Sequence, residues 1–171
     1  LRADERILAA IPMAHSYGLS SVALPALLRG SLLALPDDIA PLAPLLAARD
    51  AEATFFPTVP AYLQGLVRLR RPEAWSASLR LVISAGAALS AATAADFHAL
   101  YGQPVHGFYG ASECGGICYD REGGAAERGT VGTPVDGVAV ALDGEATPEG
   151  AGGTVVVRSS AVGVGYLPAP S

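Results

Sequence analysis

The sequence predicts an α/β fold: a five-stranded, mostly parallel sheet with helices on both faces, followed by the beginning of a small β subdomain. Between residue 5 and about residue 108, short and almost continuously apolar runs alternate with helical patterns. That alternation is typical of parallel strands that are buried on both faces. After residue 115 the helical period disappears, and short alternating segments rich in Gly and Thr take its place.

Five apolar runs are predicted to be the strands of the sheet. They lie at residues 6–12, 31–35, 53–56, 79–83 and 104–108. The run Leu-Arg-Leu-Val-Ile at 79–83 is the clearest of them, because aliphatic and β-branched residues dominate it. Their spacing leaves room for one helix in each of the four gaps.

Four helices are predicted between these strands. They cover residues 20–29, 38 to about 49, 60 to about 70, and 91–100. Asp38, Thr58 and Ser90 are the expected N-caps, since their side-chain oxygens can accept from free backbone N–H groups. Gly30 and Gly102 are the expected stops, because glycine readily adopts the left-handed conformation that ends a helix.

The last part of the chain is predicted to be a β subdomain. Residues 138–142 and 153–158 are its expected strands, with hairpin-like turns at Asp143-Gly144 and at Pro148-Glu149-Gly150. We therefore divide the chain into residues 1–120, an α/β subdomain with the ligand-binding loops, and residues 121–171, a partial β subdomain.

Composition and charge exclude several classes of protein. The chain has 171 residues, of which 51% are apolar and 16% charged, as expected for a globular protein. A net charge of −5 without a basic stripe argues against a nucleic-acid partner. No apolar run approaches the roughly 18–20 residues of a membrane span.

Cys114 and Cys118 lack the spacing of a zinc site or a disulfide framework, so free thiols and a cytoplasmic location are expected.

Two further features indicate a piece of a longer protein. The chain opens at Leu1, inside an apolar pattern, and its only methionine is Met13. All eleven basic residues are arginine, so no lysine is present for chemistry that requires one.

Three chemically distinctive segments each follow a predicted strand directly. They are Met13–Gly18, Ser84–Ala88 and Tyr109–Glu113. In a parallel sheet ligands bind outside the carboxyl ends of the strands, so all three segments are expected to meet at one edge.

The residue types in these segments are suited to binding a nucleotide, although each has a simpler interpretation. The small residues of Ser84–Ala88 would let a flat ligand lie against the backbone, or would merely suit a tight turn. Tyr109 offers a stacking face, Ser112 a hydroxyl donor and Glu113 an oxygen ligand for Mg²⁺. The alternative is a capped turn with a surface acid. His15 could line a pocket, but on the residues alone a hydrogen-bonded turn histidine is favoured.

Two other catalytic interpretations are weakened by the sequence. A nucleophile elbow around Ser112 would need glycine where Cys114 stands, and no histidine follows His106 to complete a triad. A glycine-rich phosphate loop with lysine is also missing.

With these residues the chain resembles the adenylate-forming (AMP-binding) acyl-CoA synthetases and their relatives, the 4-coumarate:CoA ligases, luciferases and peptide-synthetase adenylation domains. Pro12–Leu19 resembles the family's Pro-x-x-His-x-x-Gly segment, and Ser84–Leu89 its small-residue adenine loop. Tyr109–Glu113 resembles its Tyr-Gly-x-Thr-Glu signature, with Ser112 in place of Thr. Gly129–Pro134, followed by Val162–Tyr166, resembles the passage into its β subdomain. The matching order along the whole chain points to an internal fragment of the family's N-terminal domain.

The resemblance implies a role for each matching residue. Nucleotide binding would involve Gly86, Ala87, Ala88, Tyr109, Gly110 and Ser112. Catalysis would involve Ser112, which would hydrogen-bond the α-phosphate, and Glu113, which would also bind the metal, Mg²⁺. The acyl or thiol pocket would involve His15, Tyr17 and Gly110.

The implied reaction is an ATP-dependent acid–thiol ligation of the acyl-CoA synthetase type. A small-molecule carboxylic acid would attack the α-phosphorus of ATP and expel pyrophosphate, and CoA would then displace AMP. Two alternatives remain: an adenylation domain that loads a carrier protein, and a non-catalytic nucleotide-binding or interaction module.

The family's Lys-bearing phosphate loop, ribose-binding Asp and C-terminal catalytic Lys find no match in the sequence. The chain alone is therefore expected to be inactive without the remainder of the parent enzyme.

Overall fold

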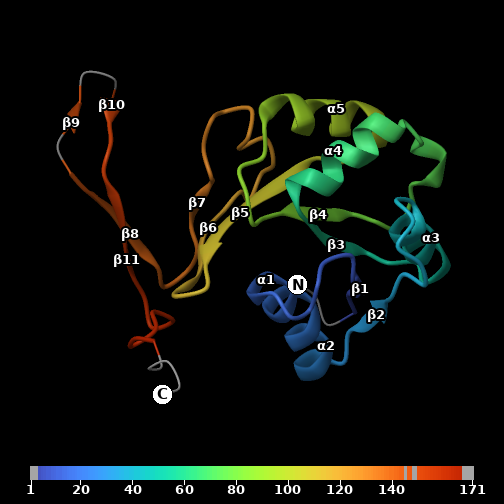
Figure 1. Ribbon diagram of the computed structural model, residues 1–171, viewed down its shortest axis with the longest axis horizontal. Coiled ribbons are helices and arrows are strands. Elements are labelled where there is room, and N and C mark those ends of the chain that lie inside the picture. The colour runs from blue at the N-terminus through green and yellow to red at the C-terminus, as the bar shows by residue number, and fades with distance from the viewer. Residues whose placement is uncertain (1–3, 145, 148–149, 167–171) are drawn as a thin grey trace, which may run out of the picture.

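Seven strands form one sheet in the order β2-β1-β3-β4-β5-β6-β7 within the residues that this computed structural model describes, 4–144, 146–147 and 150–166 (Figure 1). The first five in this order are parallel, whereas β6 and β7 join antiparallel. The strands are β1 (Arg6–Leu8), β2 (Leu32–Ala34), β3 (Phe55–Thr58), β4 (Leu81–Ser84), β5 (Val105–Ala111), β6 (Gly115–Tyr119) and β7 (Thr133–Pro134). The predicted fold class is confirmed, and two antiparallel strands extend the predicted sheet.

Helices connect the parallel strands and cover both faces of the sheet, as predicted. The helical segments are α1 (Ser16–Gly18), η1 (Leu19–Ala23), α2 (Leu24–Arg29), α3 (Ala43–Asp50), α4 (Pro60–Leu69), η2 (Pro72–Ala74) and α5 (Ala91–Tyr101). Figure 1 shows α4 and α5 on one face, with α1 and α2 on the other. In the described part of the chain, none of these helices has the length and apolarity needed to cross a membrane.

Side chains alternate between the two faces, which produces two apolar cores. Phe56 and Val82 belong to the larger core, together with residues of α3, α4 and α5. Their strand neighbours Phe55 and Ile83 belong to the second core, together with Tyr17 and Val22 of the N-terminal helical segment. This period of two explains why the strands read as continuous apolar runs: both faces of each strand are covered.

The first helical segment is longer than predicted. It starts at Ser16 rather than Ser20 and contains a π-helical turn before α2. In that turn the backbone N–H of Leu24 donates to the carbonyl of Leu19. Pro25 follows in the first turn of α2, where its missing N–H costs little. The predicted stop holds, since Gly30 caps the segment in the left-handed conformation.

The prediction that Asp38 caps the second helix is wrong. Helix α3 begins at Ala43, with Leu42 at the N-cap, and the Asp38 carboxylate accepts from the backbone N–H of Ile39 at 2.6 Å. The physical reason is Pro44. A helix that started at residue 38 would hold this proline in its interior, at a cost of about 3 kcal/mol, whereas the observed helix holds it in the first turn.

Thr58 is likewise not a helix cap. It is the last residue of β3, and Val59 occupies the N-cap of α4 without a side-chain hydrogen bond. Pro60 opens this helix instead, because its fixed φ suits the first helical position. By contrast, the prediction for the last helix is confirmed: the Ser90 hydroxyl accepts from the backbone N–H of Thr93, and Gly102 ends α5.

Beyond β7 the chain forms a two-stranded ribbon that projects from the sheet (Figure 1). Strand β8 (Ala139–Asp143) pairs with β11 (Thr154–Arg158), and β9 (Ala146–Thr147) pairs with β10 (Gly150–Ala151). The prediction of a turn at Asp143-Gly144 is therefore wrong, because the same arm continues from β8 into β9. Of the other predicted turn, Pro148 and Glu149 lie outside the described residues.

The base of the ribbon rests on β6 through a small third core. Val138 and Val157 pack there against Ile117 and the two cysteines. Cys114 and Cys118 are both buried free thiols, as predicted. Burial raises the pKa of the Cys118 thiol, which makes it less reactive as a nucleophile.

Candidate functional site

The three segments singled out in the sequence meet at the carboxyl edge of the sheet, as predicted. They follow β1 and β4 and end β5, and these strands are parallel. The Ser112 hydroxyl donates to the Ser16 hydroxyl at 2.9 Å, which joins the third segment to the first. The Tyr17 hydroxyl donates to the carbonyl of Ile83 at 2.9 Å, which joins the first segment to the strand that leads into the second.

A pocket of about 340 Å³ opens at this edge. Two segments form most of it, the loop after β4 and the end of β5, and a third wall comes from the loop before β7. Its lining residues are Ser84, Gly86, Ala87, Ala88, Leu89, Gly107, Phe108, Tyr109, Gly110, Ala126, Thr130 and Val131. Small side chains predominate, so a flat ligand could approach the backbone closely. Tyr109 supplies an aromatic side chain to the lining, and the residue is 36% exposed.

The predicted nucleotide-binding residues divide between this pocket and its surroundings. Gly86, Ala87, Ala88, Tyr109 and Gly110 all line it. The remaining predicted residues are absent from its lining: Ser112, Glu113, His15 and Tyr17. The structure thus brings together the residues expected near a base, and places those expected near phosphate or acyl groups beyond them.

His15 is engaged in the local turn. Its Nδ1 accepts from the backbone N–H of Tyr17 at 3.2 Å, so the side chain caps the start of α1. This is the geometry of a turn histidine, the interpretation favoured by the residues alone. Because Nδ1 accepts this hydrogen bond, it carries no proton in this contact.

Tyr17 belongs to the second apolar core, on the face of the sheet that α1 and α2 cover (Figure 1). Its ring stacks on Phe108, with the ring centroids 6.4 Å apart and the planes inclined by 21°. Burial raises the pKa of the Tyr17 hydroxyl well above its ordinary value, so the group stays neutral and donates to the carbonyl of Ile83. The ring is therefore a fixed apolar wall next to β4 and β5.

Gly110 is required by the hairpin between β5 and β6. A Cβ atom at this position would lie 2.6 Å from the carbonyl oxygen of Gly115, too close for any side chain. The register with β6 also shifts between Tyr109 and Gly110, because Ile117 of β6 is left without a partner there, as in a β-bulge. The backbone of Gly110 thus lies in close contact with the backbone of β6 at Gly115.

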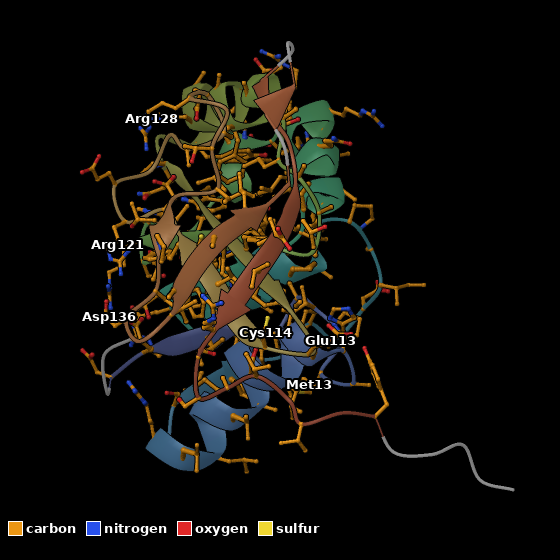
Figure 2. All side chains as sticks on the ribbon, turned by 90° about the vertical axis from the view of Figure 1, so that its left-hand side faces the viewer. Met13, Glu113, Cys114, Arg121, Arg128 and Asp136 are labelled. Atoms are coloured by element: carbon orange, nitrogen blue, oxygen red, sulfur yellow. The ribbon has the colours of Figure 1, made fainter. Side chains whose placement is uncertain are left out.

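Glu113 lies at the exposed turn after β5 (Figure 2) and is contacted by a distant segment. The Tyr166 hydroxyl donates to its Oε1 at 2.5 Å, and the backbone N–H of Gly163 donates to its carbonyl at 2.7 Å. The hydrogen bond from Tyr166 lowers the pKa of the Glu113 carboxyl below its ordinary value of 4.5. The contact therefore favours the ionised carboxylate.

We expect Tyr166→Phe to raise the pKa of the Glu113 carboxyl towards its ordinary value, because the donor is removed. The hydrogen bond stabilises the fold above the ordinary pKa and is lost as the pH falls through the lowered one. An NMR titration of the Glu113 side-chain carboxyl between pH 2 and 7 measures the change. Tyr119→Phe is the control, since that tyrosine is remote from Glu113 and stacks on His106. An unchanged midpoint in Tyr166→Phe would contradict the assignment.

At this turn Glu113 is the one carboxylate that we consider as a ligand for Mg²⁺. Within the described ranges, no group of three or more His, Cys, Asp or Glu side chains could hold a metal. Mg²⁺ is commonly bound by one or two carboxylates together with water and substrate phosphates. An ionised, exposed carboxylate at the edge of the sheet is compatible with that mode, and not with an all-protein cage.

The sequence did not predict the third wall of the pocket. Ala126, Thr130 and Val131 lie in the loop between β6 and β7, in a region assigned to the β subdomain. The available signal was its glycine content: Gly123, Gly124, Gly129 and Gly132 all adopt positive φ, as expected for a loop folded back on itself. The glycine pattern does not by itself reveal which edge of the sheet the loop covers.

Comparisons with known proteins agree with the fold and the order of the segments. The family model described as AMP-binding enzyme matches residues 1–167. A feruloyl-CoA synthase from Amycolatopsis sp. is 33% identical over 176 residues, which cover 99% of this chain and 36% of that protein. The chain thus spans about a third of the length of this curated relative.

Solved structures of similar fold include two ligand complexes. An ATP-bound RpMatB-BxBclM chimera superposes with a TM-score of 0.79 at 27% identity, covering 96% of this chain and 33% of the chimera. A malonyl-CoA ligase with methylmalonyl-CoA and AMP bound has a TM-score of 0.80 at 25% identity, covering 98% of this chain and 37% of that one.

Proposed function

The chain belongs to the AMP-binding enzyme family, and we propose from this premise that it is part of an ATP-dependent acid–thiol ligase. The proposed enzyme activates a carboxylic acid as its acyl-adenylate and transfers the acyl group to CoA. One observation carries the proposal: the family's small-residue loop and its tyrosine, Gly86–Ala88 and Tyr109, line a single pocket at the carboxyl edge of the sheet.

The proposed ligand of this pocket is the adenosine part of ATP, AMP or an acyl-adenylate. Tyr109 would stack on the base, and Gly86, Ala87 and Ala88 would pack against it through backbone and methyl groups. Purines present two apolar faces, which suits a pocket with few polar side chains. The relatives support this ligand class, since an ATP complex and an AMP complex are among the structures of similar fold.

The phosphate and acyl groups are proposed to lie beyond the pocket. Ser112 would hydrogen-bond the α-phosphate, and its hydroxyl would have to turn away from its present partner, Ser16. Glu113 would hold Mg²⁺ together with phosphate oxygens, and the ion would neutralise charge that develops on the phosphate. The acyl or thiol group would pass near His15, Tyr17 and Gly110.

The acceptor, the location and the completeness of the enzyme are further parts of the proposal. CoA is the proposed acceptor, with a carrier protein as the alternative, and a feruloyl-CoA synthase and a malonyl-CoA ligase among the relatives support CoA. A cytoplasmic location remains a prediction. The chain by itself is expected not to form acyl-adenylate, because it contains no lysine for the family's catalytic step.

Calorimetric titration of the chain with AMP, and with a non-hydrolysable acyl-adenylate analogue, tests the proposal. We expect both to bind at one site and to compete. Absence of any AMP binding, or equal binding of AMP and inorganic phosphate, would count against an adenosine site. Acyl-thioester formation by the chain alone would contradict the expectation that it is incomplete.

A further inference from the structure

The third wall of the pocket is a loop that a buried carboxylate holds in place. Asp120 directly follows β6 and is only 2% exposed. Its Oδ1 accepts from the backbone N–H of Gly123 at 3.1 Å, and its Oδ2 accepts from that of Ala125 at 2.8 Å. The Arg128 guanidinium donates to Oδ1 at 3.3 Å and to the carbonyl of Gly123 at 3.1 Å. The carboxylate therefore joins three separate points of the loop.

The same residue anchors the loop to the strand below the pocket. The backbone N–H of Asp120 donates to the carbonyl of Gly107 at 2.9 Å, and Nδ1 of His106 lies 2.7 Å from the Asp120 carbonyl. Gly107 itself lines the pocket. Asp120 is thus fixed to β5 through its backbone, while its side chain holds the loop.

The contacts continue from Asp120 to the wall of the pocket. Ala125, whose N–H donates to Asp120, accepts through its carbonyl from the backbone N–H of Thr130 at 2.9 Å. Thr130 lines the pocket, as do its neighbours in the loop, Ala126 and Val131. Two hydrogen bonds therefore separate the buried carboxylate from the pocket surface.

Packing holds the loop at two buried residues, Gly123, which lies against Pro104, and Ala125, which is only 1% exposed. A hollow of about 230 Å³ lies between the loop, at Gly123 and Glu127, and the elements behind it, at His98 and Pro104. Beside this hollow the loop has fewer packing contacts to oppose a shift, so its polar contacts matter more there. The two backbone N–H groups that donate to the Asp120 carboxylate do so in buried, charge-assisted hydrogen bonds, which are stronger than neutral ones.

We propose that Asp120 and Arg128 are positioning residues for the nucleotide pocket, which hold Ala126, Thr130 and Val131 as its wall. For the identity of the ligand this inference rests on the proposed function. Neither Asp120 nor Arg128 lines the pocket, so both act through the loop and not by contact with the nucleotide.

Arg128→Ala is the first test, because its side chain is 53% exposed and its removal leaves Asp120 with both backbone donors. We expect AMP to bind about threefold to tenfold more weakly, which matches the net contribution of one ordinary hydrogen bond, since the guanidinium is half exposed. Arg121→Ala is the matched control. Arg121 lies apart from Arg128 along the same side of the molecule (Figure 2), and it bonds to Thr133, Pro134 and Asp136 outside the pocket.

Amide hydrogen exchange gives a second readout that needs no ligand. In Arg128→Ala the exchange rates of Gly123 and Ala125 should rise, and that of Thr130 should rise with them because the three amides belong to one bonded unit. Asp120→Asn should have a larger effect on both readouts, since an amide cannot accept from both N–H groups in the place of the carboxylate. Arg128→Lys, which keeps the positive charge but replaces the guanidinium fork by a single ammonium group, should restore part of the AMP affinity.

The outcomes separate this inference from the proposed function. AMP binding by the unaltered chain with equal, small changes in Arg128→Ala and Arg121→Ala would overturn the positioning role and leave the proposed function standing. Faster exchange at Gly123 without any change at Thr130 would also overturn it, whether or not AMP binds. If the unaltered chain bound no AMP, the proposed function would fail, and this inference would fail with it.

Discussion

Tyr109→Ala is expected to weaken AMP binding by a factor between about 5 and about 150. The ring lines the pocket, and stacking of a base on an aromatic side chain contributes about 1–3 kcal/mol. The residue is more than a third exposed, so its removal leaves no large cavity in the core. The fold should therefore persist, and calorimetric titration with AMP compares the variant with the unaltered chain.

Tyr109→Phe is the matched control for this prediction. It keeps the stacking face and removes only the hydroxyl, for which no hydrogen-bond partner is recorded among the described residues. We expect its AMP affinity to stay within about twofold of the unaltered chain, since a surface hydroxyl contributes little. Equal affinities of Tyr109→Ala and the unaltered chain would show that the base does not stack on this ring.

The segment Tyr109–Glu113 could be located from the sequence. Which of its residues line the pocket and which lie in the following turn could not be predicted. Tyr109 and Gly110 still belong to β5 and face the pocket, whereas Ser112 and Glu113 lie in the turn towards β6. The bulge between Tyr109 and Gly110 and the hairpin with β6 produce this division. Both features depend on pairing with β6, a strand that was not predicted, so the residues around Tyr109 and Gly110 could not reveal them.

The strands and most helix ends were predictable because their causes are local. Alternating burial across both faces produced the apolar runs, and Ser90 and Gly102 act within one turn of their own helix. The two wrong caps have a local cause as well, since Pro44 and Pro60 determine where their helices start. Prolines should therefore have had more weight than the polar residues before them.

The third wall of the pocket, in contrast, was beyond the reach of sequence patterns. Asp120 reads in the sequence as an ordinary polar residue among other acids, and only its burial and its three donors reveal what it does. Two of those donors are backbone N–H groups of Gly123 and Ala125, whose side chains give no sign of the contact. Contacts of this kind depend on the folded path of the loop, which propensity and periodicity do not encode.

Phe56→Ala is expected to lower the free energy of unfolding by about 3–5 kcal/mol, as is typical when a buried aromatic side chain is truncated. Phe56 lies in β3 and is fully buried. Its ring meets Tyr62 of α4 edge to face, with centroids 5.8 Å apart, and Trp75 at 6.2 Å. The substitution would thus remove contacts between the sheet and the layer of helices above it. Urea unfolding, followed by the fluorescence of Trp75, the single tryptophan, measures the loss.

Leu27→Ala is the appropriate control for Phe56→Ala, because it also removes a large apolar side chain. Leu27 lies in α2 and is 80% exposed, so its truncation should change the free energy of unfolding by less than about 0.5 kcal/mol. Where Phe56→Ala does not fold, Phe56→Leu retains much of the side-chain volume and should show a smaller loss in the same direction. Similar unfolding midpoints for Phe56→Ala and Leu27→Ala would mean that the core beneath α4 does not hold the pocket-bearing sheet to its helices. A large difference would locate much of the stability of the chain in that core, where the sheet that carries the pocket meets α4 and α5.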